Sequence, residues 1–299
     1  MKARYLLFFS YIGTTFRSSE KLWIKMGRQY PDPESVQGIM EIALLKFKSE
    51  NYPAVNLSSR TDGGVHALNT SAHIDLVPRS GAKLFHQDTI PYELNKYFLK
   101  RDISIFVKEA IRVNNDFSAR RNAISRTYLY SKMLIIGLQF SEKVYQKKPK
   151  QFDIEKFKEA AKYFEGYHDF TTFKKFDKLK QHKHNRRYIY SINVRPGQPI
   201  VTSYTNTQTR NFDYWDVEIK GHSFVHNQIR RMVGSLITVA SGKIEPKDIK
   251  LMLQIPSKHS WISQITSIPP NGLYLCNVEY KPEDLIYNSK NDNEIVSGN

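Results

Sequence analysis

Strand-like and helix-like segments alternate along this chain, and the series runs through twice. The first series has strands over residues 4–13, 52–59, 66–77 and 102–113, with helices over 35–50 and 88–100. The second has strands over 125–135, 186–196, 211–221 and 272–280, with helices over 153–166, 224–242 and 246–254. This pattern predicts an α+β protein of two similar α/β halves. We expect mixed, mainly antiparallel sheets joined side by side, with the active-site cleft between the halves.

The helical segments show the spacing of elements with one buried face. After Ser35, apolar residues recur at intervals of three and four. Ser35 and Asp153 are residues that commonly accept hydrogen bonds at the start of a helix. We expect an N-terminal half over residues 1–112, a C-terminal half over 113–281 and a polar, disordered tail over 282–299.

The charge balance indicates the kind of partner. The 299 residues include 45 Lys and Arg but 29 Asp and Glu, a net charge of +16. Such an excess favours a polyanion, either nucleic acid or an anionic membrane surface. The charge is spread through an aromatic-rich chain and does not form one basic amphipathic helix, so we favour nucleic acid. No stretch is long enough to span a membrane, and we expect no membrane partner.

Other features leave the compartment open. The single cysteine, Cys276, rules out an intrachain disulfide and a multi-cysteine zinc site. The first 19 residues carry Lys2, Arg4 and Arg17 but no acid, which faintly resembles an organellar presequence. The same residues also read as the first strand of the fold.

The segment SSRTDGGVHALN, residues 58–69, has two readings. Asp-Gly favours a tight turn, because glycine accepts positive φ and aspartate bonds its own downstream backbone. The second reading is a catalytic loop that holds the carboxylate of Asp62 beside the guanidinium of Arg60. The flanking strands are compatible with both readings.

Two more positions could take part in chemistry. Tyr128 lies on a predicted strand, as a core aromatic or as a platform for a stacked base. Arg230 and Arg231 lie in the most strongly predicted helix, next to apolar residues on both sides. A buried arginine is costly unless it has a hydrogen-bonding partner, so we expect the inward-facing one to pair with an anion, for which Asp62 is the candidate.

Residues 173–187 contain seven Lys or Arg and one Asp. The segment is either a solvated surface or a contact for phosphates. The candidate RNA-binding residues are Lys174, Lys175, Arg186 and Arg187. His182 and His184 have basic neighbours and no nearby carboxylate or thiolate, so we expect no metal there.

Five segments, in the same order, resemble motifs of the TruA family of tRNA pseudouridine synthases. They are SRTDGGVHA, DFSARRNAISRTYLY, GYHDFTTF, FVHNQIRRMVGSL and PPNGLYLCNVEY, and together they cover roughly residues 4–280. In detail they are most similar to an animal branch of the family. The resemblance implies an RNA isomerase that converts uridine to pseudouridine in the anticodon arm of tRNA, with no metal or organic cofactor.

The same resemblance implies a role for each matching residue. Asp62 would be the catalytic carboxylate, and Arg230 would keep it ionised and oriented. Tyr128 would pack on the uracil face, Arg60 would fill the space left by the displaced nucleotide, and Leu273 would close the apolar side of the pocket. Bacterial members are dimers, so a homodimer is one of the states compatible with the family.

Departures from the family pattern concern RNA choice more than chemistry. Ser59 stands where the family has glycine, Asn69 where it has glutamine, and Ile268 where it has a small residue. The alternative function is an inactive RNA-binding protein on the same scaffold. A metal-dependent nuclease is a third reading, but it lacks clustered carboxylates. The branch suggests mitochondria, with cytoplasm or nucleus as alternatives.

Overall fold

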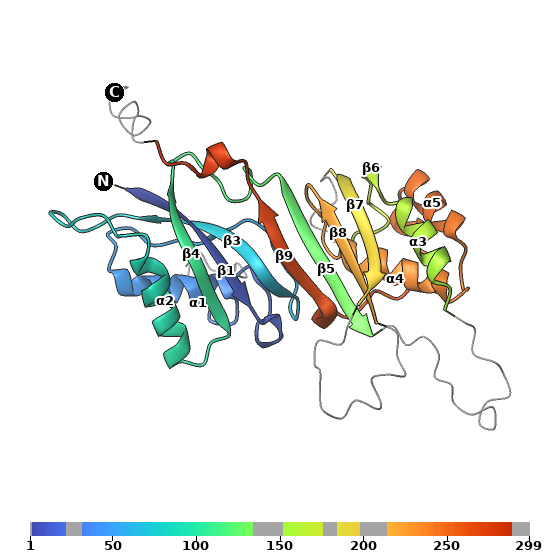
Figure 1. Cartoon of the computed structure of the whole chain (residues 1–299), viewed down its shortest axis with the longest axis horizontal. Helices are drawn as coiled ribbons and strands as arrows, with labels where there is room; N and C mark the ends of the chain where they lie inside the picture. The colour runs from blue at the N-terminus through green and yellow to red at the C-terminus, as the bar shows by residue number, and fades with distance from the viewer. Residues whose placement is uncertain (1, 22–31, 134–151, 176–183, 198–213, 289–299) are drawn as a thin grey trace. The chain divides into compact units, whose positions relative to one another are not determined.

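The structure, a computed structural model, describes residues 2–21, 32–133, 152–175, 184–197 and 214–288 (Figure 1). The chain forms two compact units. The first contains Met1–Arg126 and Tyr274–Asn299, and the second contains Thr127–Leu273. Both combine helices with mainly antiparallel strands, which confirms the predicted α+β class.

The sheet of the first unit has the strand order β4-β1-β3-β9. The strands are β4 (Ile105–Val113), β1 (Ala3–Tyr11), β3 (His66–Leu76) and β9 (Leu273–Glu279), and the short β2 (Asn56–Leu57) pairs with β3. Strand β1 runs antiparallel to both neighbours, whereas β3 and β9 are parallel through His66 opposite Tyr274 and Ala67 opposite Leu275. The unit is therefore built around β1, whose Leu6, Leu7 and Phe9 are fully buried.

In the described part of the first unit there are two α-helices, α1 (Val36–Leu44) and α2 (Thr89–Lys100). The side chain of Ser35 accepts a hydrogen bond from Gly38 N, so the expected N-cap is confirmed. The predicted helix over 35–50 is α-helical only to Leu44, because a 3-10 turn follows and Lys48 has a φ of 49°. Helix α2 packs on β4, and α1 packs on α2.

The first unit extends further along the chain than the expected boundary at residue 112. Arg4 Nη1 donates to Phe117 O at 2.6 Å, and Ala119 N donates to His73 Nδ1 at 3.1 Å. These bonds attach the segment after β4 to the sheet, so the units divide after Arg126. The predicted tail is also more ordered than expected up to residue 288. It begins with a 3-10 turn over Pro282–Leu285, and residues 289–299 lie outside the described part.

The sheet of the second unit has the order β5-β8-β7-β6. The strands are β5 (Ser125–Met133), β8 (Tyr214–Gly221), β7 (Arg186–Pro196) and β6 (Gly166–Asp169). Strand β7 is antiparallel to both β6 and β8. The four residues of β6 were not expected to form a strand, because the segment GYHD is too short to show a periodicity.

Among its described residues the second unit has three α-helices, α3 (Ile154–Lys162), α4 (Gln228–Ala240) and α5 (Pro246–Gln254), and α3 packs against the other two (Figure 1). Asp153 caps α3 as expected by accepting a hydrogen bond from Lys156 N. Helix α4 begins later than predicted, because Asn227 at its N-cap has a φ of 61°. No helix in the described ranges is long and apolar enough to cross a membrane.

Candidate active site

Asp62 lies in a tight turn of the first unit that is anchored on both sides. The buried Thr61 donates its N–H to Ser19 Oγ at 2.7 Å and accepts from Ser19 N at 3.2 Å. Asp62 itself forms an isolated antiparallel bridge with Ser18, and its carbonyl accepts from Val65 N at 3.2 Å. The aspartate is half-buried. The backbone therefore holds this carboxylate in one place.

The glycines of this turn are required by space and by conformation. A Cβ on Gly63 would lie 2.4 Å from the carbonyl oxygen of Arg17, and Gly64 has a φ of 82°. Across the turn, a Cβ on Gly13 would lie 1.9 Å from the carbonyl oxygen of Val65. The tight-turn reading of residues 58–69 is therefore confirmed, whereas the reading as a catalytic loop stays a prediction.

Two side chains beside the turn differ in their surroundings. His66 accepts a hydrogen bond from Gly13 N at 3.3 Å, and its ring stacks on Tyr274 with centroids 4.8 Å apart. Arg60 is exposed and forms an ion pair with Glu20 at 2.9 Å. An exposed pair of this kind contributes at most about 1 kcal/mol. Breaking the pair between Arg60 and Glu20 therefore costs little.

Arg126 is a supporting residue that the sequence analysis missed. It is buried, and its guanidinium donates to the carbonyl oxygens of Ser58, Arg120 and Ala123 at 2.9 to 3.1 Å. Its Nε also donates to Ser59 Oγ at 3.2 Å. Arg126 thus holds the chain just before the Asp62 turn. Ser59, which replaces the family's glycine, adds a bond that glycine cannot make.

Tyr128 and Leu273 lie in the second unit, and both side chains are buried. The ring of Tyr128 meets Phe224 edge to face, with centroids 5.3 Å apart. Tyr130 is more deeply buried, and burial raises its pKa to about 12 although the charge of Arg230 lowers it. Tyr130 also packs against the glycine before Leu273, where a Cβ would lie 2.9 Å from its ring.

Arg230 lies in the first turn of α4 and is partly buried. Its Nε donates to Ile268 O at 2.8 Å, and its Nη1 donates to Asn227 Oδ1 at 2.7 Å. These bonds orient the guanidinium within the second unit. Asp62 belongs to the first unit, so the expected pair between Asp62 and Arg230 stays a prediction.

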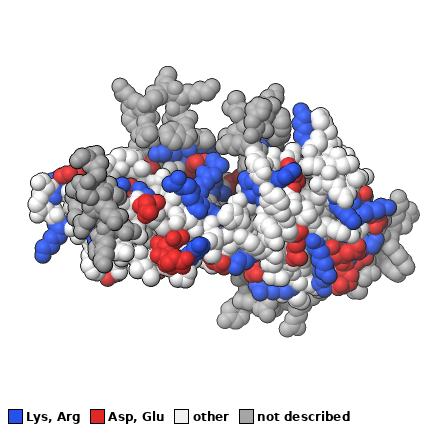
Figure 2. Space-filling model, turned by 90° about the horizontal axis from the view of Figure 1, so that it is seen from above, with Lys and Arg blue, Asp and Glu red and all other residues white. Residues whose placement is uncertain are grey.

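The four candidate RNA-binding residues lie at the two described ends of the segment 174–187. Lys174 Nζ donates to Asn185 Oδ1 at 3.3 Å, and Arg186 follows Asn185 in the chain. Arg187 lies opposite His168 on β6, and its Nη1 donates to His184 O at 3.0 Å. Lys175 N donates to His226 O at 3.0 Å. More broadly, basic side chains are spread over the face seen in Figure 2, with acidic ones between them.

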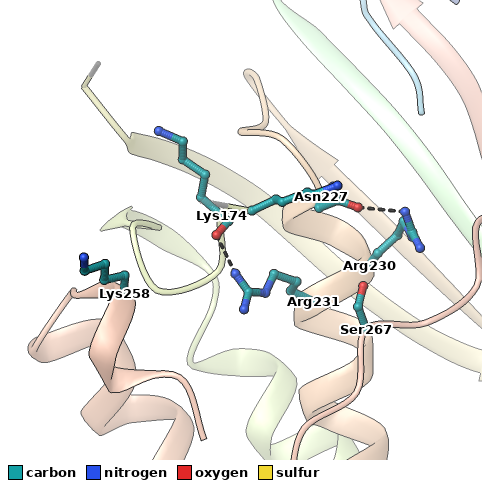
Figure 3. A pocket seen from close by; sticks show the side chains of 7 residues that line it. Lys174, Asn227, Arg230, Arg231, Lys258 and Ser267 are labelled. Carbon is teal, nitrogen blue, oxygen red and sulfur yellow. Dashed lines mark hydrogen bonds between the residues drawn. The ribbon is translucent and has the colours of Figure 1, made fainter. Parts of the chain in front are cut away.

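A cavity of about 480 Å³ opens within the second unit (Figure 3). Five of its seven lining residues are cations. The lining residues are Lys174, Lys175, Asn227, Arg230, Arg231, Lys258 and Ser267. In the described part of the chain, no three His, Cys, Asp or Glu side chains gather as they would around a metal ion. His182 lies outside the described residues. The charge of the cavity suits an anion.

Comparison with known proteins agrees with these features. Residues 160–281 match a family model described as tRNA pseudouridine synthase. The chain is 30% identical over 293 residues to tRNA pseudouridine synthase-like 1 of Xenopus laevis, covering 95% of this chain and 93% of the relative. The human protein of that name is 33% identical over 293 residues, covering 94% and 91%. The tRNA pseudouridine synthase A of Agrobacterium fabrum is 31% identical over 254 residues, covering 82% and 84%.

The family model and the relatives place the protein among enzymes of the isomerase class. At this identity over nearly the whole chain, the protein belongs to the tRNA pseudouridine synthase family.

Proposed function

We propose that this protein converts uridine to pseudouridine in tRNA, within the anticodon arm, and that Asp62 is its catalytic carboxylate. The observation that carries the proposal is the fixed position of Asp62, in a half-buried turn with anchored backbone on both sides. The relatives named tRNA pseudouridine synthase support the choice of RNA.

The reaction is an isomerisation and needs no co-reactant. The bond between ribose C1′ and uracil N1 breaks, the bond between C1′ and C5 forms, C5 loses a proton and N1 gains one. Asp62 supplies the carboxylate that starts this exchange, as a nucleophile or as a base. The target nucleotide must first leave its stack, which costs a few kcal/mol.

The other candidate residues act around this step. Arg230 keeps Asp62 ionised, because a nearby positive charge lowers the pKa of a carboxylate. Tyr128 packs on the uracil, and Leu273 closes the apolar side. Arg60 releases Glu20 and fills the space that the nucleotide leaves.

Tritium release tests the proposal. A transcribed tRNA carrying tritium at uracil C5 loses the label when C5 bonds to C1′. We expect release by the wild type in the presence of a chelator and none by Asp62→Asn. A matched control is Asp116→Asn, since Asp116 is exposed and outside the site. Binding of the tRNA by both proteins without release would indicate the inactive RNA-binding protein. Light scattering on the same samples gives the oligomeric state and so tests self-association.

A further inference from the structure

The cavity of the second unit carries more positive charge than Arg230 alone supplies, and this charge suits an anion. No carboxylate is among the lining residues that the structure describes, and three of these residues come from different segments. Arg231 is on α4, Lys258 is in the 3-10 turn Lys258–Ser260, and Ser267 is on the segment after it. Figure 3 shows these side chains among those that line the cavity, with Arg231 between Lys258 and Ser267 in this view.

Arg231 is held in place before any ligand arrives. Its guanidinium carbon lies 3.8 Å from the centre of the Trp261 ring, and its Nη1 donates to the carbonyl oxygen of Lys174. The ring of Trp261 in turn packs edge to face against Phe173, with centroids 6.0 Å apart. The aromatic core therefore supports the position of Arg231. Burial lowers the pKa of Arg231. The fold therefore maintains a partly desolvated cation at this wall of the cavity.

Ser267 adds an observation of a different kind. Its Oγ is buried and has no hydrogen-bonding partner within the described residues. A buried hydroxyl without a partner is uncommon in native proteins and needs an explanation. Ser267 lines the cavity, so a ligand there can supply the partner.

The first turn of α4 contributes to the lining of the same cavity. Asn227 is its N-cap, and Asn227, Arg230 and Arg231 all line the cavity. The first turn of a helix carries partial positive charge and N–H groups without partners inside the helix. These groups favour an anion at this end of α4.

We propose that this cavity binds one backbone phosphate of the substrate RNA, with Arg231, Lys258 and Ser267 as its ligands. The assignment rests on the proposed function, because it takes RNA as the source of the phosphate. Arg231 offers planar donors suited to phosphate oxygens, Lys258 offers a point charge, and the hydroxyl of Ser267 donates the third bond. Arg230 lines the same cavity, so the phosphate site adjoins a residue of the proposed active site.

Two mild substitutions test the site without disturbing the core. Lys258 is exposed, and Ser267 Oγ has no partner within the described chain, so Lys258→Gln and Ser267→Ala should fold normally. Lys250→Gln is the matched control, because Lys250 is exposed on α5 and does not line the cavity. Binding of a fluorescent tRNA transcript is measured by anisotropy between about 50 and 200 mM salt.

We expect Lys258→Gln to reduce the slope of log affinity against log salt by about 0.7 to 0.9, the value for one lost phosphate contact. Ser267→Ala should weaken tRNA binding several-fold and leave the Tm unchanged or higher. Lys250→Gln should keep the wild-type slope. Equal slopes for Lys258→Gln and Lys250→Gln would overturn the proposal.

Two further measurements separate the possible outcomes. Inorganic phosphate that raises the Tm of the wild type but not of Lys258→Gln, with equal tRNA slopes, would assign the cavity to free phosphate and overturn the RNA assignment. Tritium release is recorded on the same proteins. If the wild type releases none while the slopes differ as expected, the proposed function fails and the phosphate site stands.

Discussion

Arg230 and Ile268 exchange two hydrogen bonds, so helix α4 and the segment before β9 hold each other in register. Ile268 N donates to Arg230 O at 3.2 Å, and Arg230 Nε donates to Ile268 O at 2.8 Å. The guanidinium therefore cannot turn without moving this segment. The position of a proposed active-site cation is thereby tied to the packing of α4 one turn away.

Gly234 tests that connection. A Cβ there would lie 2.3 Å from the carbonyl oxygen of Thr266, a distance that requires the segment to move. Alanine stabilises an exposed helix by about 1 kcal/mol relative to glycine, but here we expect Gly234→Ala to lower both Tm and turnover. Gly81→Ala is the comparison, because an added Cβ at Gly81 would meet no atom and only the positive φ opposes the substitution. A rise in the Tm of Gly234→Ala would contradict the close packing.

Arg126 should act on the rate more than on binding. Arg126→Lys keeps the charge but cannot make the four bonds to residues 58, 59, 120 and 123, so the Asp62 turn loses its support. We expect kcat to fall at least about tenfold with KM for tRNA nearly unchanged. Arg79→Lys, an exposed change in the same unit, is the control. A rise in KM with normal kcat would instead indicate that Arg126 contacts RNA.

Asp62→Asn should bind tRNA as tightly as the wild type or more tightly. The substitution removes a negative charge that RNA phosphates must approach, and it keeps the shape of the side chain. Anisotropy with the transcribed tRNA measures the Kd. A large loss of affinity would mean that Asp62 holds the fold or the RNA and would count against a purely chemical role.

Arg186 and Arg187 should contribute to affinity through phosphates. Arg186 is exposed on β7, and Arg187 has a neutral carbonyl partner in His184. We expect the double change to Gln to weaken binding and reduce the salt slope by about 0.7 to 0.9 per lost contact. An unchanged slope would indicate that these two residues lie on a solvated surface and contact no phosphate.

His73 should make the protein less stable in mild acid. Burial is the main cause that lowers its pKa from 6.5 to about 4, and the charge of Arg4 lowers it further. The unfolded chain therefore binds the proton first, so stability is complete above about pH 6.5 and falls towards pH 4. The loss is at most about 1.4 kcal/mol per pH unit.

Urea unfolding across this pH range measures the effect of His73. His73→Asn is the matched variant, since an amide oxygen can accept the hydrogen bond from Ala119 N. We expect the free energy of unfolding of the variant to depend less on pH than that of the wild type. Parallel curves would show that His73 does not control acid stability.

The sequence correctly predicted the features that depend on residues adjacent in the chain. Ser35 and Asp153 cap their helices as expected, because a cap depends on bonds within one turn. The start of α4 was placed too early, because apolar spacing does not reveal the left-handed backbone of Asn227. Strand β6 was missed because it owes its existence to its partner β7.

The residues of the candidate site divide in the same way, into those that local spacing can predict and those that depend on the fold. Residues two apart on a strand share a face, so the strand predicted around Tyr128 also places Arg126 on the face of Tyr128. That signal could have found the arginine, which is as buried as Tyr128. The meeting of Arg231, Lys258 and Ser267 could not be predicted, because it depends on how the chain returns after α5.

The parallel pairing of β3 with β9 has a consequence for synthesis. The first unit is made from the beginning and the end of the chain, whereas the second is continuous. While the ribosome is still translating the second unit, β3 lacks its β9 neighbour and presents an open edge. Tyr280, which bonds Ser71 and Ala119 O at 2.7 Å, is missing too. The second unit can therefore finish folding first, and the half that carries Asp62 matures only when the last strand emerges.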